Sequence, residues 1–231
     1  MQNPFDVMVI TAHPDDAEFG AAGTVALWTR EGKSIVYIVC TDGDKGTSDR
    51  NLTPEALIAI RKKEQRDACR QLGVSEVVFL GYGDQTLEDT PGFRKHLVEM
   101  IRMYRPTTIL TLDPYRRYLW HRDHRIVGQV VMDAVFPFAR DHMAYPDLLE
   151  KGLEPHKVKE LLFFGSEDIN VHIDIEETFD LKLAALQCHE SQVRELGNGD
   201  LRQWLSNRCR LLAKGSGYQL AEAFHKVRLP D

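Results

Sequence analysis

Four short apolar runs, each followed by a longer segment with helical periodicity, constrain the fold of this chain more than any other feature of its sequence. The runs lie at residues 6–12, 34–41, 74–81 and 107–113. Such runs, rich in β-branched residues, are typical of strands that are buried on both faces. Strands that alternate with helices form βαβ units with right-handed crossovers. The sequence therefore predicts an α/β, Rossmann-like fold with a mostly parallel sheet flanked by helices.

The segments after these runs supply the predicted helices. They lie at 17–33, 54–73 and 91–105, and a fourth begins near His124. Beyond about residue 140 the pattern is less regular. The elements predicted there are two strands at 161–166 and 171–175, two helices at 177–189 and 200–215, and a final strand or extended edge at 221–229. No repeat or linker interrupts the chain, so we expect residues 1–231 to form a single domain.

The overall composition excludes several classes of protein. Of the 231 residues 43% are hydrophobic and 28% charged, and the formal net charge is -6. Nucleic acid is not expected as a partner, because phosphate binding requires a concentrated basic surface. The first residues lack a secretory pattern, and no apolar run approaches the roughly 18 residues of a membrane span, so we expect a cytoplasmic protein without membrane insertion. The four cysteines form no CxxC pair, which indicates free thiols.

The residues HPDD directly follow the first apolar run and contain His13, Asp15 and Asp16. A histidine and two carboxylates at the end of a buried strand are costly to desolvate, and a bound metal ion would compensate. A dinucleotide site would instead require GxGxxG in this turn, and two carboxylates there would repel phosphate. Asp15 or Asp16 as a simple N-cap of the following helix is the plainer alternative.

Polar residues follow the other predicted strands as well. TDGDKG follows the second strand, GYGDQ the third, and a loop that ends in His121 and His124 the fourth. Because ligands bind at the carboxyl ends of the strands in an open parallel sheet, these loops and HPDD are expected to converge on one site.

A zinc hydrolase needs three protein ligands and an open position for water. His13, Asp16 and His124 form such a set, and Asp15 and His121 then lie beside the metal as candidate general base and oxyanion stabiliser. His13 and Asp15 with a distant histidine also match the 2-His-1-carboxylate pattern of non-haem Fe(II) oxygenases. The alternation of strands and helices disfavours this second interpretation, because those oxygenases are β jelly rolls.

Several segments, taken in order, resemble one family. HPDDAEFGAAGT, TDGDKG, RKKEQ, the HRDH pair and KLAALQCHESQ are similar to motifs of the PIG-L/LmbE-like family of metal-dependent N-deacetylases, and they extend from about residue 7 to residue 227. The resemblance implies a zinc-dependent hydrolase that removes the acetyl group from an N-acetylated amino sugar or a related small-molecule amide. Another divalent cation in place of zinc stays open.

The resemblance also implies roles for single residues. His13, Asp16 and His124 bind the metal, Asp15 is the general base, and His121 stabilises the oxyanion. Arg61 contacts the substrate or is an ion-paired helix residue, and Asp123 either orients His121 or caps the helix. Arg122 stands where the family usually has proline, a departure that leaves the ligands intact. We assign a structural role to a further set of matching residues, His189, Ser191 and Gln192.

Two functional alternatives stay open from the sequence. One is a non-catalytic module that binds metal or sugar, although binding alone requires neither Asp15 nor His121. The other is a metal phosphoesterase, for which a second ion would need additional carboxylates, here Asp42, Asp44 and Asp84. Three aromatic residues suit either sugar stacking or loop packing: Tyr115, Tyr118 and Trp120. Family members are commonly oligomers, so a homo-oligomer is consistent with the resemblance.

Overall fold

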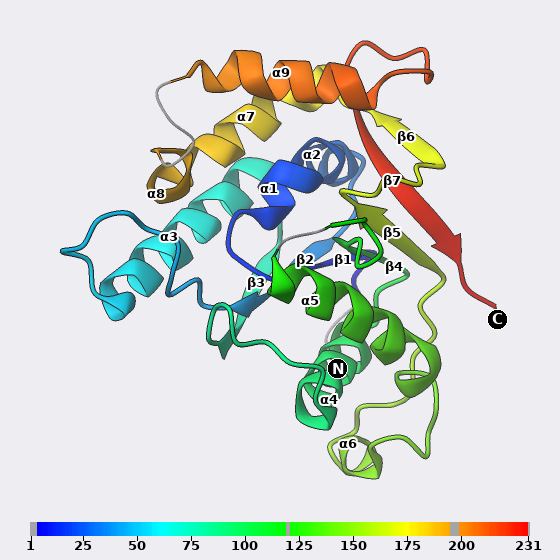
Figure 1. Cartoon of the computed structure of the whole chain (residues 1–231). Helices are drawn as coiled ribbons and strands as arrows, with labels where there is room; N and C mark the ends of the chain where they lie inside the picture. The colour runs from blue at the N-terminus through cyan, green and yellow to red at the C-terminus, as the bar shows by residue number, and fades with distance from the viewer. Residues whose placement is uncertain (1–3, 119–120, 195–198, 231) are drawn as a thin grey trace.

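A seven-stranded sheet forms the centre of the computed structural model, which describes residues 4–118, 121–194 and 199–230 (Figure 1). The strand order is β3-β2-β1-β4-β5-β7-β6. The strands are β1 (Val7–Thr11), β2 (Ile35–Thr41), β3 (Glu76–Tyr82), β4 (Thr108–Leu112), β5 (Glu160–Phe164), β6 (Val171–Asp174) and β7 (Ala221–Arg228). Neighbouring strands from β3 to β5 are parallel, which confirms the predicted α/β fold with a mostly parallel sheet.

The C-terminal part of the sheet is antiparallel. Strand β7 pairs with β5 on one side and with β6 on the other, in both cases antiparallel. The prediction of a final strand is therefore confirmed, but its alternative as an extended edge is wrong. The edge strand at this end of the sheet is the shorter β6, which precedes β7 in the chain.

Helices cover both faces of the sheet. They are α1 (Asp16–Gly20), α2 (Ala22–Arg30), α3 (Pro54–Leu72), α4 (Pro91–Tyr104), α5 (Arg122–Asp133), α6 (Pro146–Glu150), α7 (Phe179–Gln187), α8 (Glu190–Val193) and α9 (Leu201–Leu212). Figure 1 shows α2, α3 and α7 on one side of the sheet and α4 and α5 on the other. Within the described ranges, no helix is long and apolar enough to cross a membrane.

The helix predicted at 17–33 is in fact two helices. The chain breaks at Ala21, whose φ is -144°. The start of α2 is set by Glu222 of β7, whose carboxylate accepts hydrogen bonds from the backbone N–H groups of Gly23 (2.9 Å) and Thr24 (2.7 Å). These N–H groups have no partner within the helix, and Glu222 lies about 200 residues along the chain, so local periodicity did not reveal the break.

The central strands determine where a ligand can bind. From β1 the chain runs to β2 and β3 on one side, then crosses β1 to β4 and β5 on the other. The connections that follow β1 and β4 therefore leave the sheet on opposite faces. A crevice opens between them at the carboxyl ends of these two buried strands, the usual ligand position in such a sheet.

Candidate metal centre and active site

The turn between β1 and α1 fixes the direction of Asp16. Its Oδ2 atom accepts hydrogen bonds from the backbone N–H groups of Ala12 (3.1 Å) and His13 (2.8 Å), which turns the carboxylate back toward the end of the strand. Asp15 precedes the helix with φ of 100°, and its side chain makes no capping hydrogen bond. The alternative in which one of these carboxylates only caps the helix therefore does not fit the geometry.

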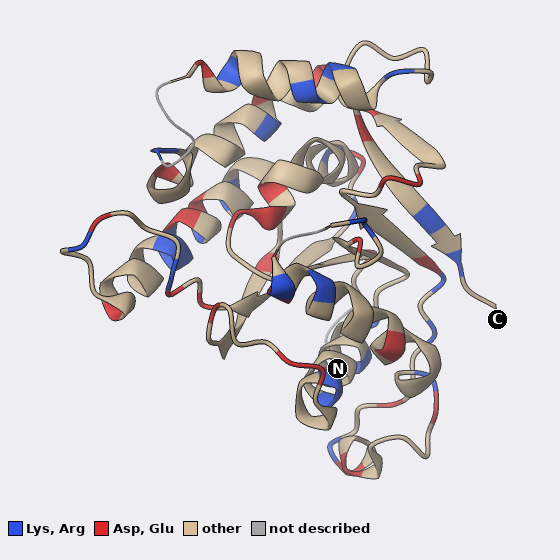
Figure 2. Cartoon of the chain, viewed as in Figure 1, with Lys and Arg blue, Asp and Glu red and all other residues tan. Residues whose placement is uncertain are grey.

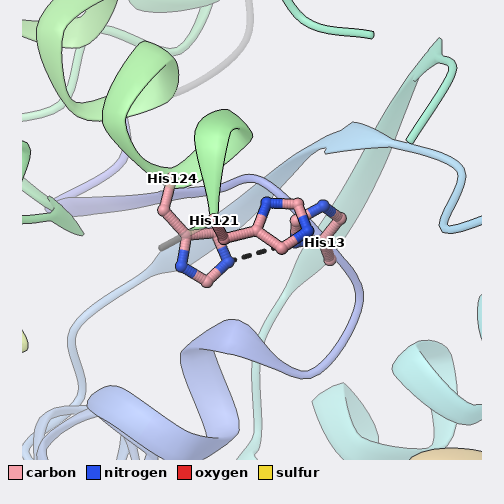
Figure 3. Close-up of side chains that lie close together, drawn as sticks. All are labelled: His13, His121 and His124. Carbon is pink, nitrogen blue, oxygen red and sulfur yellow. Dashed lines mark hydrogen bonds between the residues drawn. The ribbon is translucent and has the colours of Figure 1, made fainter. Parts of the chain in front are cut away.

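Helix α5 supplies two histidines to the same crevice. His121 is the residue before the helix, and His124 lies in its first turn. The Nδ1 atom of His13 is 3.2 Å from Nε2 of His124, and the rings of His121 and His124 stack with centroids 4.8 Å apart. Figure 3 shows the three imidazoles converging from the β1 turn and from α5.

The donor atoms of the predicted ligand set fit a zinc ion. Asp16 Oδ1 lies 3.1 Å from His124 Nε2, and Asp16 Oδ2 lies 3.5 Å from His13 Nδ1. Tetrahedral zinc with bonds of about 2.0–2.2 Å places its ligand atoms roughly 3.3 Å apart. The spacing of these nitrogen and oxygen atoms agrees with this value. His121 is also near, since one nitrogen from each of the three histidines falls within a 4.8 Å cluster.

The second nitrogen of His13 faces two carboxylates. Its Nε2 atom lies 3.3 Å from Asp123 Oδ2 and 3.0 Å from Asp84 Oδ1. A metal-binding histidine generally donates its other N–H to a carboxylate, which fixes the tautomer and orients the ring. Asp84, one of the carboxylates that a second ion would need, lies against His13 in this structure. Asp123 likewise contacts His13 and the backbone N–H of Gln85, and no hydrogen bond to His121 is found in the described residues.

Asp15 is buried next to the predicted ligand set. Unlike those of Asp16, its contacts are with residues of helix α3. Its backbone N–H donates to Gln65 Oε1 (3.0 Å), and its Oδ2 atom lies 3.4 Å from Arg61 Nη2. Burial raises the pKa of Asp15 to about 6, although the charge of Arg61 opposes this shift. A carboxylate with a pKa in this range is well matched to accept and return a proton near neutral pH.

The pKa values of Asp16 and His121 are lowered, whereas that of Asp15 is raised. Burial alone would raise the pKa of Asp16, but the contacts with His124 and His13 hold it well below its usual range, so this carboxylate stays ionised. Burial and the imidazoles of His13 and His124 lower the pKa of His121. The Nδ1 atom of His121 is buried and has no hydrogen-bond partner in the described structure.

Arg61 belongs to α3, contacts Asp15 and is only 3% exposed. Its guanidinium donates to the carbonyl oxygens of Pro14 (2.8 Å), Lys45 (3.1 Å) and Gly43 (3.3 Å). These contacts join the loops that follow β1 and β2. The predicted contact of Arg61 with substrate stays a prediction, because its hydrogen bonds in this structure are to the protein itself.

The KLAALQCHESQ segment packs behind the site. His189 Nε2 lies 3.2 Å from Glu18 Oε2, and Gln65 donates to the other oxygen of Glu18 (3.0 Å). Ser191 donates from both its backbone and its hydroxyl to Glu64. This segment therefore reaches Asp15 through Glu18 and Gln65. The sequence analysis missed Glu18 and Gln65, for which the only signal was their position inside recognised motifs.

The remaining predicted residues lie around this centre. Asp42 pairs with Lys62 (2.7 Å), and Asp44 pairs with Lys45 (2.8 Å). Lysines already neutralise these two carboxylates, which makes them poor ligands for a second cation. Tyr115 is 69% exposed and Tyr118 90% exposed, so neither packs the loop. Trp120 lies outside the described residues.

A cavity of about 210 Å³ adjoins the ligand set. Asp16 and His124 form part of its wall, and Phe19, Leu112 and Phe164 provide apolar surface. Close packing at this wall explains Gly20, because a Cβ atom there would lie 2.3 Å from Phe164 Cδ2. The cavity is therefore placed to hold a small molecule against the metal ligands.

Comparison with known proteins agrees with the fold and the motifs. Diacetylchitobiose deacetylase of Thermococcus kodakarensis is 33% identical over 221 residues, which cover 96% of this chain and 82% of that protein. The probable N-acetyl-alpha-D-glucosaminyl L-malate deacetylase 2 of Bacillus anthracis is 30% identical and covers 83% of each protein. The solved structure of N,N'-diacetylchitobiose deacetylase from Pyrococcus horikoshii, complexed with its inhibitor MPG, has a TM-score of 0.90 and 28% identity, and covers 98% of this chain and 85% of that one.

The family comparison covers the strands and loops that build the site. The family described as PIG-L, GlcNAc-PI de-N-acetylase, matches residues 8–135, which include all five of the predicted metal-binding and catalytic residues. This match extends over more than half of the chain. The resemblance drawn from the motifs is thereby confirmed: this chain belongs to the PIG-L family of N-deacetylases.

Proposed function

We propose that this chain is a zinc-dependent hydrolase that removes the acetyl group from an N-acetylated amino sugar, releasing acetate and a free amine. The observation that carries the proposal is the placement of Asp15. This buried carboxylate, with its pKa raised to about 6, lies directly beside a set of three converging metal ligands. Metal binding alone would not require it, whereas hydrolysis requires a base.

His13, Asp16 and His124 are the residues that would hold the zinc ion. When bound, the ion would lower the pKa of a water molecule toward about 7 and polarise the acetamide carbonyl group. Asp123 supports the site by accepting the second N–H of His13, and the Asp84 carboxylate lies 3.0 Å from the same nitrogen. The choice of zinc over another divalent cation is part of the proposal.

The protein's own groups then carry the proton transfers. Asp15 accepts a proton from the attacking water and returns it to the leaving nitrogen as the C–N bond breaks. His121 lies across the crevice and donates an N–H hydrogen bond to the oxyanion, which either protonation state of the imidazole can supply. Arg61 and Gln65 hold Asp15 in position through its side chain and backbone.

The test is metal content per chain, measured together with acetate release from a panel of N-acetylated amino sugars. One zinc per chain and acetate release that stops on chelation support the proposal. Release of phosphate from sugar phosphates without acetate release, or two ions per chain, would favour a phosphoesterase. Metal binding without turnover of any panel member would favour a non-catalytic binding module.

The proposal extends to the organisation of the protein. We propose that residues 1–231 form a single domain that acts in the cytoplasm on a small-molecule substrate and assembles as a homo-oligomer. One continuous sheet with one large core supports the single domain. Unfolding followed by two spectroscopic probes tests the single domain, which predicts one coincident transition. Sedimentation equilibrium tests the homo-oligomer.

A further inference from the structure

Two arginines line the cavity that adjoins the predicted metal ligands. Arg116 belongs to the loop after β4, and Arg208 belongs to α9, 92 residues further along the chain. Asp16 and His124 line the same cavity. The two cations therefore face the space in which a substrate would lie when its acetamide reaches the metal centre.

Neither arginine has an acidic partner among the residues that the structure describes. Other arginines of these elements do: Arg117 lies 3.5 Å from Glu167, and Arg202 lies 2.6 Å from Asp180. Asp113 also lines the cavity, but its Oδ1 atom accepts a hydrogen bond from the backbone N–H of Tyr115 (2.7 Å). Arg116 and Arg208 therefore have no ion-pair partner in the described part of the chain, although the carboxylates of Asp113 and Asp16 line the same cavity.

Arg208 contacts one aromatic side chain, which in turn contacts helix α1. Its guanidinium lies over the ring of Trp204 at 5.8 Å, one helical turn away, and Trp204 packs edge-on against Phe19 of α1 at 6.0 Å. Helix α9, which carries other basic residues as well (Figure 2), is thereby docked beside the crevice. Partial desolvation and the charge of Arg116 lower the pKa of Arg208, although the residue is exposed overall.

We propose that Arg116 and Arg208 form a subsite for an anionic group of the substrate, so that the preferred substrate is an N-acetylated amino sugar that carries a phosphate or carboxylate group. The inference rests on the proposed deacetylase function and adds the substrate class to it. Two arginines that line one cavity and have no ion-pair partner among the described residues suit a planar or tetrahedral oxyanion, which they can bind through paired N–H donors.

The experiment compares one sugar with and without charge. The probes are methyl N-acetyl-glucosaminide, which is neutral, N-acetylglucosamine 1-phosphate and N-acetylglucosaminyl malate, the latter two distinguishing phosphate from carboxylate. We expect KM for at least one anionic probe to be about tenfold lower than for the neutral one. Arg208→Gln and Arg116→Gln should each remove most of this difference, with kcat nearly unchanged and the neutral probe unaffected.

The matched control is Arg210→Gln, which removes an exposed arginine from the same helix that does not line the cavity. Equal KM values for neutral and charged probes would overturn the subsite while leaving the deacetylase function standing. If no probe is hydrolysed, the deacetylase function fails, and calorimetric binding of the two anionic probes decides the subsite alone. The subsite is supported if Arg116→Gln and Arg208→Gln both weaken the binding of the anionic probes and Arg210→Gln leaves it unchanged. It is refuted if all three variants bind these probes as the wild type does.

Discussion

The Nδ1 atom of His13 lies 3.2 Å from the Nε2 atom of His124, although 111 positions separate the two residues in the chain. Two nitrogen lone pairs can approach this closely only if a proton or a metal ion lies between them. Asp16 completes the triangle with an oxygen 3.1 Å from His124 Nε2. This relationship supports the proposed metal centre, and it leads to the following predictions.

Asp16→Asn is expected to remove the metal, whereas Asp15→Asn is expected to retain it and lose about 10²-fold or more in turnover. The reason is that Asp16 directs an oxygen to the ligand set, and Asp15 contacts Arg61 and Gln65 instead. Metal content and acetate release, measured on the same preparations, test both. A metal-loaded Asp16 variant together with a metal-free Asp15 variant would reverse the assignment.

Asp123→Asn is expected to weaken zinc affinity by about 10–100-fold without abolishing binding. The asparagine keeps an oxygen for the backbone N–H of Gln85, but it loses the charge that orients His13. Competition with a chromogenic chelator measures the affinity. Asp44→Asn is the control, because Asp44 lies on a neighbouring loop and pairs with Lys45. Equal affinities for both variants would contradict the role of Asp123.

Gly43→Ala is expected to reduce turnover by about 10²-fold, because its Cβ atom would lie 2.8 Å from Arg61 Cζ and displace the guanidinium behind Asp15. Gly32→Ala is the matched control. Both glycines have positive φ (62° and 85°), so both variants carry a similar backbone penalty of roughly 1 kcal/mol, but nothing lies within 4 Å of a Cβ at Gly32. Equal turnover in the two variants would show that the position of Arg61 is immaterial.

Lys182→Met is expected to lower the free energy of unfolding by about 3–5 kcal/mol. Lys182 is buried, and its Nζ atom donates to Glu222 Oε1 (2.6 Å) and to the carbonyl oxygens of Glu18 and Phe19. Its removal leaves the Glu222 carboxylate buried without a counter-ion. Urea unfolding measures the loss, and adding Glu222→Gln should recover part of it. A loss below about 1 kcal/mol would contradict the importance of this pair.

His189 is expected to stabilise the fold more at low pH than at high pH. Burial lowers the pKa of His189, but the interaction with Glu18 outweighs burial and raises it above its usual value. The folded state therefore binds a proton more tightly than the unfolded state. This stabilisation is complete below the unfolded pKa of about 6.5 and disappears as the pH rises through the folded value.

Urea unfolding of the wild type and of His189→Gln at pH 6 and pH 9 tests this sign. The difference in free energy of unfolding between the two proteins should be larger at pH 6. Groups that titrate in both proteins contribute equally and cancel. A difference that grows toward pH 9 would mean that the histidine is buried neutral and that Glu18 does not hold its proton.

The parallel sheet and the candidate ligand set could both be predicted from the amino-acid sequence. Alternation of apolar runs and helical segments predicts strands β1 to β4 and their helices, and burial on both faces accounts for the apolar runs of β1, β2 and β4. The rule that loops at the carboxyl ends of strands meet then brings His13 and His124 to one site without any coordinates. The motif resemblance added the roles of Asp15 and His121.

The groups that support that site are visible only in the folded structure. Glu222 accepts the hydrogen bonds that begin α2, and Glu18 and Gln65 connect His189 to Asp15. Asp84 contacts His13 from a distant segment of the chain. Periodicity reports how a side chain faces the core, and it carries no information about which buried carboxylate meets which donor. The cavity with Arg116 and Arg208 has the same origin, because it exists only where α9 docks against α1.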